Sequence, residues 1–177
     1  MISDFISKKI REEFGFEPTD QQSVLIEKLA LFIMSNENHK AFLLKGYAGT
    51  GKTSIVSAVV RAMNSLEQKT VLLAPTGRAA KVLSGYSGFA AYTIHKKIYR
   101  QKSIADFRFQ LSDNLHKNTL FIVDEASMIS NSSGETAFGS GRLLDDLIEY
   151  VYSGEGCSLL LLGDTAQLPP VEQSQSP

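Results

Sequence analysis

The stretch GYAGTGKT, Gly46 to Thr53, lies between a short apolar run at residues 41–44 and a helical pattern at residues 52–65. It matches the spacing G-x-x-x-x-G-K-[ST], in which glycines let the backbone curl so that successive N–H groups face phosphate oxygens. The dipole of the following helix adds positive potential at the same point. The stretch therefore predicts a phosphate-binding loop between a strand and a helix, which indicates an α/β fold.

Two side chains of this loop have defined tasks in such a site. Lys52 supplies a positive charge for the β- and γ-phosphates of a nucleotide, and Thr53 places its hydroxyl on Mg²⁺. The other candidate nucleotide-binding residues of the loop and the first helical turn are Gly46, Ala48, Gly49, Thr50, Gly51 and Ser54. The alternative is a glycine-rich turn with an exposed lysine.

Short apolar runs alternate with helical stretches along the rest of the chain. The predicted strands are residues 41–44, 70–74, 120–123 and 158–162, separated by helices at 52–65, 77–84 and 141–152. Helices at 2–14 and at about 20–35 precede them, the second begun by Thr19 and Gln22 at the spacing of a capping box. This alternation predicts a parallel sheet with helices on both faces. Residues 99–118, polar and basic, interrupt it as a small insertion.

Polar residues follow the last two predicted strands. Asp124 is expected to hold Mg²⁺, directly or through water, and the adjacent Glu125 to polarise the attacking water. Gln167, beyond the fourth strand, carries a donor and an acceptor and could sense the γ-phosphate. The alternatives are an acidic strand end with a helix cap and a proline-terminated loop.

Composition limits the possibilities further. The 177 residues, 43% of them hydrophobic, fit one folded domain, 1–177. The longest apolar run, Leu29 to Met34, is far shorter than the roughly 20 residues of a membrane span. A charged N-terminus in place of a signal sequence predicts a cytoplasmic protein without membrane partners. The single cysteine, Cys157, excludes an internal disulfide.

The net charge of −1 conceals a gradient along the chain. Residues 61–119 hold ten basic and three acidic side chains, whereas residues 120–177 hold one basic and nine acidic. The asymmetry suggests separate surfaces for anions and cations, and a chance division of solvated charge is the alternative.

Six segments taken together resemble the Q motif and motifs I, Ia, Ib, II and III of superfamily 1 DNA helicases, especially the RecD-like and Dda-like enzymes that move 5′ to 3′. They are Thr19-x-x-Gln22, Gly46 to Thr53, Ala74 to Ala80, Thr93 to His95, Asp124 to Ser127 and Gly163 to Pro170. They stand in family order over about residues 17–171. The resemblance implies a P-loop NTPase of RecA-like fold, lobe 1A of a helicase, which binds ATP and Mg²⁺.

The resemblance also implies roles for single residues. Gln22, or its neighbour Gln21, would hydrogen-bond the adenine edge and so select ATP. Residues 99–118 occupy the place where Dda-like helicases carry a β-hairpin pin (subdomain 1B), and basic and aromatic side chains there suit phosphates and bases. The alternative is a polar loop anchored by its two phenylalanines. Partners would be single-stranded DNA and its junctions with duplex. The implied DNA-binding residues are Pro75, Thr76, Gly77, Arg78, Thr93, His95, Phe107 and Phe109.

One departure from the family pattern is large. Nothing in the sequence resembles motifs IV to VI, which belong to a second RecA-like lobe that supplies arginine fingers. We therefore expect the chain to be the first lobe of a longer protein, with weak nucleotide binding and little or no hydrolysis alone. The rival interpretations are a P-loop ATPase or kinase that does not act on DNA, and a catalytically incomplete nucleotide-binding module. The preferred DNA structure and the pathway, whether repair, recombination or replication, stay open.

Overall fold

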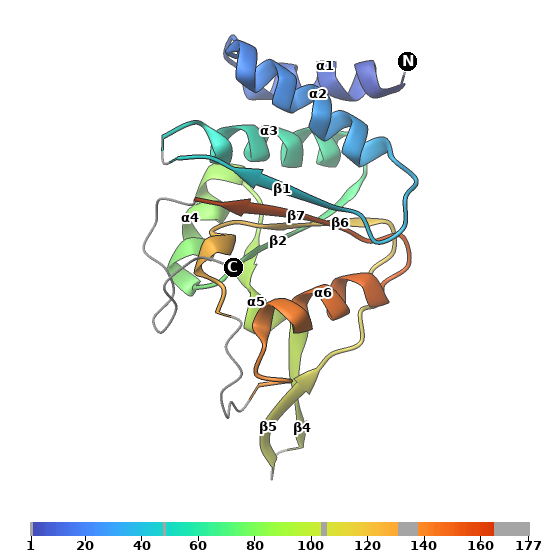
Figure 1. Cartoon of the computed structure of the whole chain (residues 1–177), viewed down its shortest axis with the longest axis vertical. Helices are drawn as coiled ribbons and strands as arrows, with labels where there is room; N and C mark the ends of the chain where they lie inside the picture. Colours follow the sequence, from blue (N-terminus) through green and yellow to red (C-terminus); the bar gives the residue numbers. More distant parts are fainter. Residues whose placement is uncertain (1, 48, 104–105, 131–137, 165–177) are drawn as a thin grey trace.

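The computed structural model describes residues 2–47, 49–103, 106–130 and 138–164 (Figure 1). Its main sheet has five parallel strands in the order β1-β7-β6-β2-β3. Their bounds along the chain are β1 Ala41–Lys45, β2 Lys69–Ala74, β3 Ala91–Thr93, β6 Thr119–Val123 and β7 Ser158–Gly163. The predicted α/β fold with a parallel sheet is confirmed.

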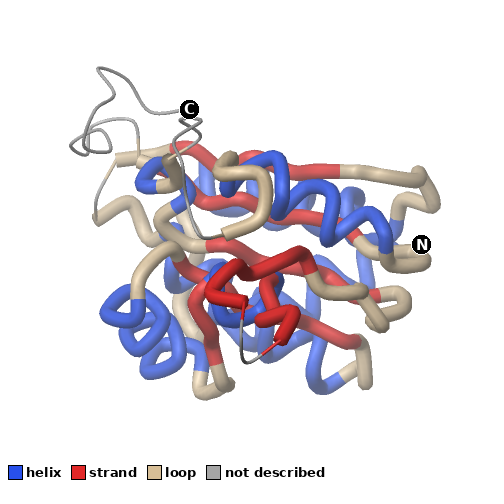
Figure 2. Tube along the Cα trace, turned by 90° about the horizontal axis from the view of Figure 1, so that it is seen from below, coloured by secondary structure: helices blue, strands red, loops and turns tan. Residues whose placement is uncertain are grey.

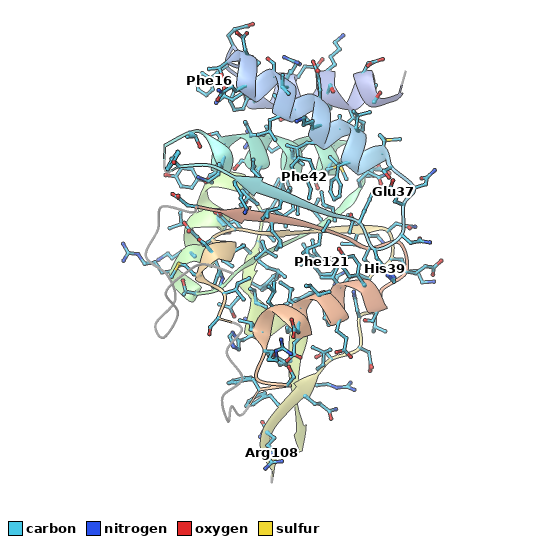
Figure 3. The ribbon with its side chains drawn as sticks, in the orientation of Figure 1. Phe16, Glu37, His39, Phe42, Arg108 and Phe121 are labelled. Atoms are coloured by element: carbon cyan, nitrogen blue, oxygen red, sulfur yellow. The ribbon has the colours of Figure 1, made fainter. Side chains whose placement is uncertain are left out.

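Helices cover both faces of this sheet, as the apolar runs of the strands require (Figures 1 and 2). One face carries α1 Ile2–Phe14, α2 Asp20–Met34, α3 Lys52–Ser65 and α4 Gly77–Ser87, and the other carries α5 Ile94–Ile98 and α6 Leu143–Ser153. The central strand β6 divides its side chains between them. Leu120 and Ile122 join the core under α1 to α4, whereas Phe121 and Val123 join the core under α6. Figure 3 shows Phe121 on the α6 side and Phe42 on the α2 side.

The capping box predicted at the start of α2 is confirmed. The backbone N–H of Gln22 donates to Thr19 Oγ1 at 3.3 Å, and the backbone N–H of Thr19 donates to Gln22 Oε1 at 3.0 Å. These bonds satisfy backbone donors that the first turn of a helix leaves without partners. They also fix Gln22 at the end of α2 that faces the phosphate-binding loop.

A two-stranded antiparallel hairpin stands apart from the main sheet. It consists of β4 Tyr99–Ser103 and β5 Asp106–Leu111, and it projects from the end of the molecule opposite α1 and α2 (Figure 1). The remainder of the expected insertion, residues 112–118, returns to β6, and Asn114 Nδ2 donates to the carbonyl oxygen of Tyr150 at 2.9 Å. The insertion therefore joins the body at both of its ends.

The differences from the expected elements are local. The sequence did not predict β3 or α5, because elements of three and five residues show too little periodicity to be recognised. Helix α4 continues to Ser87, and α6 begins at Leu143 rather than at residue 141. A single 3₁₀ turn, η1 Ala126–Met128, follows β6. None of the helices in the described ranges is long and apolar enough to cross a membrane.

Candidate functional site

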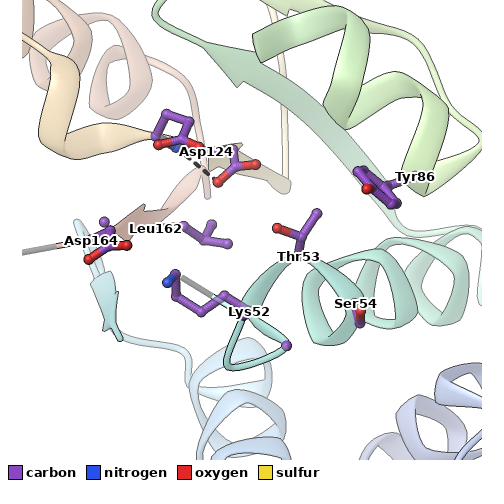
Figure 4. Close-up of a pocket in the computed structure, with 11 residues that line it drawn as sticks. Lys52, Thr53, Ser54, Tyr86, Asp124, Leu162 and Asp164 are labelled. Carbon is purple, nitrogen blue, oxygen red and sulfur yellow. Dashed lines mark hydrogen bonds between the residues drawn. The ribbon is translucent and has the colours of Figure 1, made fainter. Parts of the chain in front are cut away.

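A cavity of about 360 Å³ opens at the carboxyl edge of the main sheet (Figure 4). Parallel strands place their carboxyl ends at one edge, so the loops after β1, β6 and β7 meet there. The lining residues come from the predicted loop, from the ends of β6 and β7, and from α4. They are Gly49, Gly51, Lys52, Thr53, Ser54, Tyr86, Asp124, Glu125, Leu162, Gly163 and Asp164.

The loop owes its shape to backbone conformations that favour glycine. Gly49 and Gly51 have φ angles of 79° and 84°, in the left-handed region. A Cβ atom on Gly51 would lie 2.8 Å from Nε2 of Gln22. That nitrogen donates to the carbonyl oxygen of Thr50 at 3.4 Å. The structure therefore brings the side chain of Gln22 against the loop.

Lys52 folds back over the loop that precedes it. Its Nζ donates to the carbonyl oxygen of Gly46 and, at 2.8 Å, to that of Tyr47. The backbone N–H of Gly46 in turn donates to the carbonyl oxygen of Gly163 at 3.4 Å, which ties the loop to the end of β7. The ammonium group is thus held inside the curve of the loop, where a phosphate would lie.

Asp124 stands across the cavity from the loop (Figure 4). Burial raises the pKa of its carboxyl group, and the charge of Glu125 raises it further. Two effects lower the same pKa: a hydrogen bond from the backbone N–H of Glu125 to Asp124 Oδ1 at 2.9 Å, and the charge of Lys52. A bound cation would stabilise the charged form of this carboxyl group, because the attraction offsets the free-energy cost of burying the charge.

Glu125 has a left-handed backbone, with φ 55° and ψ 36°. For a residue with a Cβ atom this conformation costs roughly 1–2 kcal/mol. Strain of this kind concentrates at functional sites, where the surrounding structure holds a side chain in place. Here it turns the chain sharply between β6 and η1 and leaves Glu125 in the lining of the cavity.

Thr53 and Asp124 fit the predicted magnesium site. Both line the one cavity, and they offer a hydroxyl and a carboxylate oxygen. Mg²⁺ beside a nucleotide usually takes one or two such protein ligands and completes its shell with phosphate oxygens and water. Within the described residues there is no group of three or more His, Cys, Asp or Glu that could hold a metal by itself.

Tyr86 and Asp164 line the cavity although neither was among the predicted site residues. Asp164 is 4% exposed, and its backbone N–H donates to Ser127 Oγ at 3.5 Å, which joins the end of β7 to η1. Its position after a buried strand repeats that of Asp124, so the same reasoning could have identified it. Tyr86 reaches the cavity from the last turns of α4, and no local pattern indicates this.

Six of the eight residues predicted to contact DNA lie at the starts of α4 and α5, and the other two, Phe107 and Phe109, lie on β5. Thr76 Oγ1 accepts from the backbone N–H of Ala79 at 3.2 Å, and Thr93 Oγ1 accepts from that of Lys96 at 3.2 Å. Ala74 is the register partner of Thr93, so both helix starts lie at the same edge of the sheet. Pro75 is half-buried, while Thr76, Gly77 and Arg78 are exposed there.

His95 and Phe109 lie in an aromatic cluster at the base of the hairpin. The centroid of the His95 ring lies 5.7 Å from that of Tyr99 and 5.1 Å from that of Phe138, and burial lowers the pKa of its imidazole. Phe109 stacks on Phe138 at 4.6 Å between centroids. Both rings therefore pack the hairpin onto the body.

Three predicted residues cannot be assessed in the same way. Ala48 and Gln167 lie outside the described residues, as does the side chain of Phe107, whose backbone belongs to β5. Arg100 forms an ion pair with Asp113 at 3.1 Å, and Arg108 lies toward the far end of the hairpin (Figure 3).

Comparison with known proteins gives a consistent picture. A family model described as "AAA domain" matches residues 19–176. The ATP-dependent RecD2 DNA helicase of Deinococcus radiodurans is 30% identical over 173 residues, which are 94% of this chain and 20% of that protein. The ATP-dependent DNA helicase dda of phage T4 is 29% identical over 146 residues, 75% of this chain and 29% of its own.

Among solved structures, the Pif1 helicase of Candida albicans matches 88% of this chain and 34% of its own, with a TM-score of 0.48 and 18% identity. This chain spans less than two thirds of the length of the curated relatives named above.

Proposed function

The chain belongs to the AAA domain family, and from that premise we propose that it is the first motor lobe of an ATP-dependent DNA helicase of superfamily 1. Its similarity to RecD-like and Dda-like helicases, expected from six motifs, is confirmed by the relatives. The observation that carries the proposal is the convergence of Lys52, Thr53, Asp124 and Glu125 on one cavity.

The first step is the binding of Mg-ATP at the loop. The ammonium of Lys52 exchanges the Gly46 and Tyr47 carbonyl oxygens, its present acceptors, for oxygens of the β- and γ-phosphates. Thr53 and Asp124 would hold Mg²⁺, which when bound would supply positive charge beside the phosphates. Gln22, fixed by the capping box against the loop, hydrogen-bonds the adenine edge.

Hydrolysis then depends on Glu125. Its carboxylate, on the cavity wall, accepts a proton from the attacking water as a general base. The water oxygen bonds to the γ-phosphorus while the bond from that phosphorus to the bridging oxygen breaks, and ADP leaves. Asp124 Oδ1 accepts a hydrogen bond from the backbone N–H of Glu125, so the residue that would hold the metal is bonded to the residue that activates water. The described lining of the cavity includes no arginine, so a second lobe would supply the arginine fingers.

Single-stranded DNA would bind along the edge where α4 and α5 begin. Helix α4 starts at the exposed Thr76–Arg78 segment, and Tyr86, about 14 Å further along the helix axis, lines the nucleotide cavity. One rigid helix therefore joins the two proposed binding regions. The hairpin β4–β5 would act as a pin at a junction of single-stranded and duplex DNA.

The ATPase activity of the protein that includes the second lobe tests this proposal. We expect Mg²⁺-dependent hydrolysis that single-stranded DNA stimulates many-fold. Glu125→Gln should keep nucleotide affinity and lower turnover by about 10²- to 10⁴-fold, the usual contribution of a general base. Turnover that is indifferent to DNA would contradict a helicase.

Two alternatives remain distinguishable by experiment. A P-loop kinase would transfer the γ-phosphate to an acceptor other than water, so a screen of phosphoacceptors with and without DNA would reveal it. A nucleotide-binding module without catalysis is favoured for the chain alone by the cavity lining, which lacks arginine among its described residues. It would bind Mg-ATP and stay inactive even when the second lobe is supplied.

A further inference from the structure

A basic and aromatic surface lies on the outer side of β3 and α5, away from the nucleotide cavity. We call it the α5 surface, and it comprises Lys69, Tyr92, Lys96, Lys97 and His116. Tyr92 belongs to β3, an edge strand, and its side chain is 40% exposed. None of these five residues belongs to the motifs by which the chain resembles helicases.

Two ammonium groups converge on the ring of Tyr92. Nζ of Lys96 and Nζ of Lys97 each lie 5.9 Å from its centroid. A ring face attracts a cation at this distance, which orders two flexible lysines around one exposed aromatic side chain. Positive charge that tracks a backbone, combined with an exposed ring, is the arrangement by which proteins bind single strands.

Ion pairs distinguish the lysines of this surface from other basic residues of the chain. Several other basic residues are paired, as Arg61 is with Glu13 and Lys117 with Glu155. In contrast, Lys69, Lys96 and Lys97 form no ion pair within the described part of the chain.

The pKa of His116 is sensitive to the positive charge of this surface. Burial lowers the pKa of its imidazole, and the charges of Lys97 and Lys69 lower it further. His116 shares a shallow cavity of about 500 Å³ with Lys69 and Tyr92, in which Glu67 is the single acidic lining residue. These lysines are therefore close enough to act together on one ligand.

The α5 surface is continuous with the edge already proposed to bind DNA. Tyr92 directly precedes Thr93, whose hydroxyl caps α5, and Lys96 and Lys97 lie in the next turn. On the other side of that edge, Arg78 is exposed in the first turn of α4. Helix α5 itself, Ile94–Ile98, contains no acidic residue, so the charge of Lys96 and Lys97 follows this edge directly along the chain.

We propose that the α5 surface is a second contact region for single-stranded DNA, in which Lys96 and Lys97 bind backbone phosphates and Tyr92 stacks on a base. The inference rests on the proposed function, because it extends the same strand beyond Thr76 and Thr93. It assigns binding to three residues, Tyr92, Lys96 and Lys97, that lie outside the helicase motifs.

Fluorescence anisotropy with labelled oligo-dT over a series of salt concentrations tests the proposal on the 177-residue chain. The double variant Lys96→Ala/Lys97→Ala should lower affinity roughly ten-fold at low salt. It should also reduce the slope of log affinity against log salt by about 1.4, since each phosphate contact on a single strand contributes about 0.7. Tyr92→Ser should weaken binding roughly five-fold or more, while Tyr92→Phe keeps the ring and the affinity.

A matched control removes the same charge elsewhere. Lys8→Ala/Lys28→Ala deletes two exposed lysines on α1 and α2, at the end of the molecule remote from the hairpin (Figure 1). It should change affinity less than two-fold. Circular dichroism of every variant checks that the fold is kept.

The outcomes separate this inference from the proposed function. If the unaltered chain fails to bind oligo-dT at low salt, both are overturned. If Arg78→Ala weakens binding while the Lys96/Lys97 variant behaves like the control, the inference alone is wrong. A third outcome is that the Lys96/Lys97 variant loses as much affinity for heparin as for oligo-dT, while Tyr92→Ser changes neither affinity. The surface would then bind polyanions in general, which also overturns the assignment to single-stranded DNA.

Discussion

The nucleotide cavity and the base of the hairpin are built by different means. The cavity is shaped mainly by the backbone, because two left-handed glycines, one helix start and two strand ends form the site. At the hairpin base, side chains from distant segments meet. Phe138 stacks on Phe109, and Asp146 of α6 accepts a hydrogen bond from the Tyr99 hydroxyl at 2.6 Å.

This difference decides how each region responds to substitution. A backbone site loses function when a single charge or glycine changes, while the fold survives. A region held by buried side chains loses stability, while the chemistry elsewhere continues. Changes in the cavity should therefore alter ligand affinity, and changes at the hairpin base should alter the free energy of unfolding.

The largest effect is expected from Lys52→Ala. The substitution removes the charge that meets the phosphates, and hydrogen bonds to charged groups contribute about 1.5–3 kcal/mol. Affinity for Mg-ATP should therefore fall about 10- to 100-fold in calorimetric titration, with unchanged thermal stability. Lys28→Ala, an exposed lysine on α2, is the control. Equal affinities for the two variants would show that the loop is not the phosphate site.

Tyr99→Phe should act on stability instead. Asp146 is 4% exposed and accepts from the Tyr99 hydroxyl and, at 3.0 Å, from the backbone N–H of Ser140. Loss of one donor to this buried carboxylate should lower the free energy of unfolding by about 1–3 kcal/mol in urea titration. Tyr150→Phe removes a hydroxyl to which the described structure gives no hydrogen bond, so it should cost less. Mg-ATP affinity should stay the same in both.

The same hydroxyl makes the hairpin base sensitive to alkaline pH. Burial and the hydrogen bond to Asp146 raise the pKa of Tyr99 above its ordinary value of 10.0. The folded state then keeps a proton that the unfolded state loses, so this contribution to stability is present below about pH 10 and is lost as the pH rises further. Urea titrations between neutral and alkaline pH should show a smaller decline for Tyr99→Phe. An equal decline would mean that Tyr99 does not contribute.

Two glycine substitutions separate the effect of left-handed backbone strain from the effect of a contact with Gln22. Gly51→Ala places a Cβ atom on a left-handed residue and against Gln22 Nε2, whereas Gly88→Ala meets the same backbone strain in open space. Both should cost about 1–2 kcal/mol of stability. Only Gly51→Ala should also weaken Mg-ATP binding. If Gly88→Ala weakened binding equally, the contact between Gln22 and the loop would be irrelevant to the site.

The smallest effect is expected from Thr19→Ala. The change removes the cap of α2 and should cost about 1 kcal/mol, within the usual range for N-caps. It also frees Gln22, so the selectivity for ATP over GTP should decline in competition binding. Thr93→Ser, which keeps a capping hydroxyl on α5, serves as a control for N-cap changes and should leave both quantities unchanged.

The sequence predicted the cavity better than the hairpin base, for physical reasons. The turn Gly46–Thr53 and the strand end at Asp124 are contiguous in the chain, and their residue types are required locally. The hairpin base depends on contacts of Tyr99 with Phe138 and Asp146. Both residues lie far along the chain from Tyr99, so no local sequence pattern predicts these contacts. For the same reason the sequence does not predict Tyr86, because it lies near the end of α4, most of a helix away from Thr76.

The most direct test of the whole account maps amide chemical shifts in the nitrogen–proton NMR spectrum of the chain. Mg-ATP should shift the amides of Gly49 to Ser54 and of Asp124, while those of the hairpin strands stay in place. Oligo-dT should instead shift amides near Thr76, Thr93 and Lys96. Nucleotide-induced shifts that avoid Gly49 to Ser54 would contradict the assignment of this edge as the motor's ATP site.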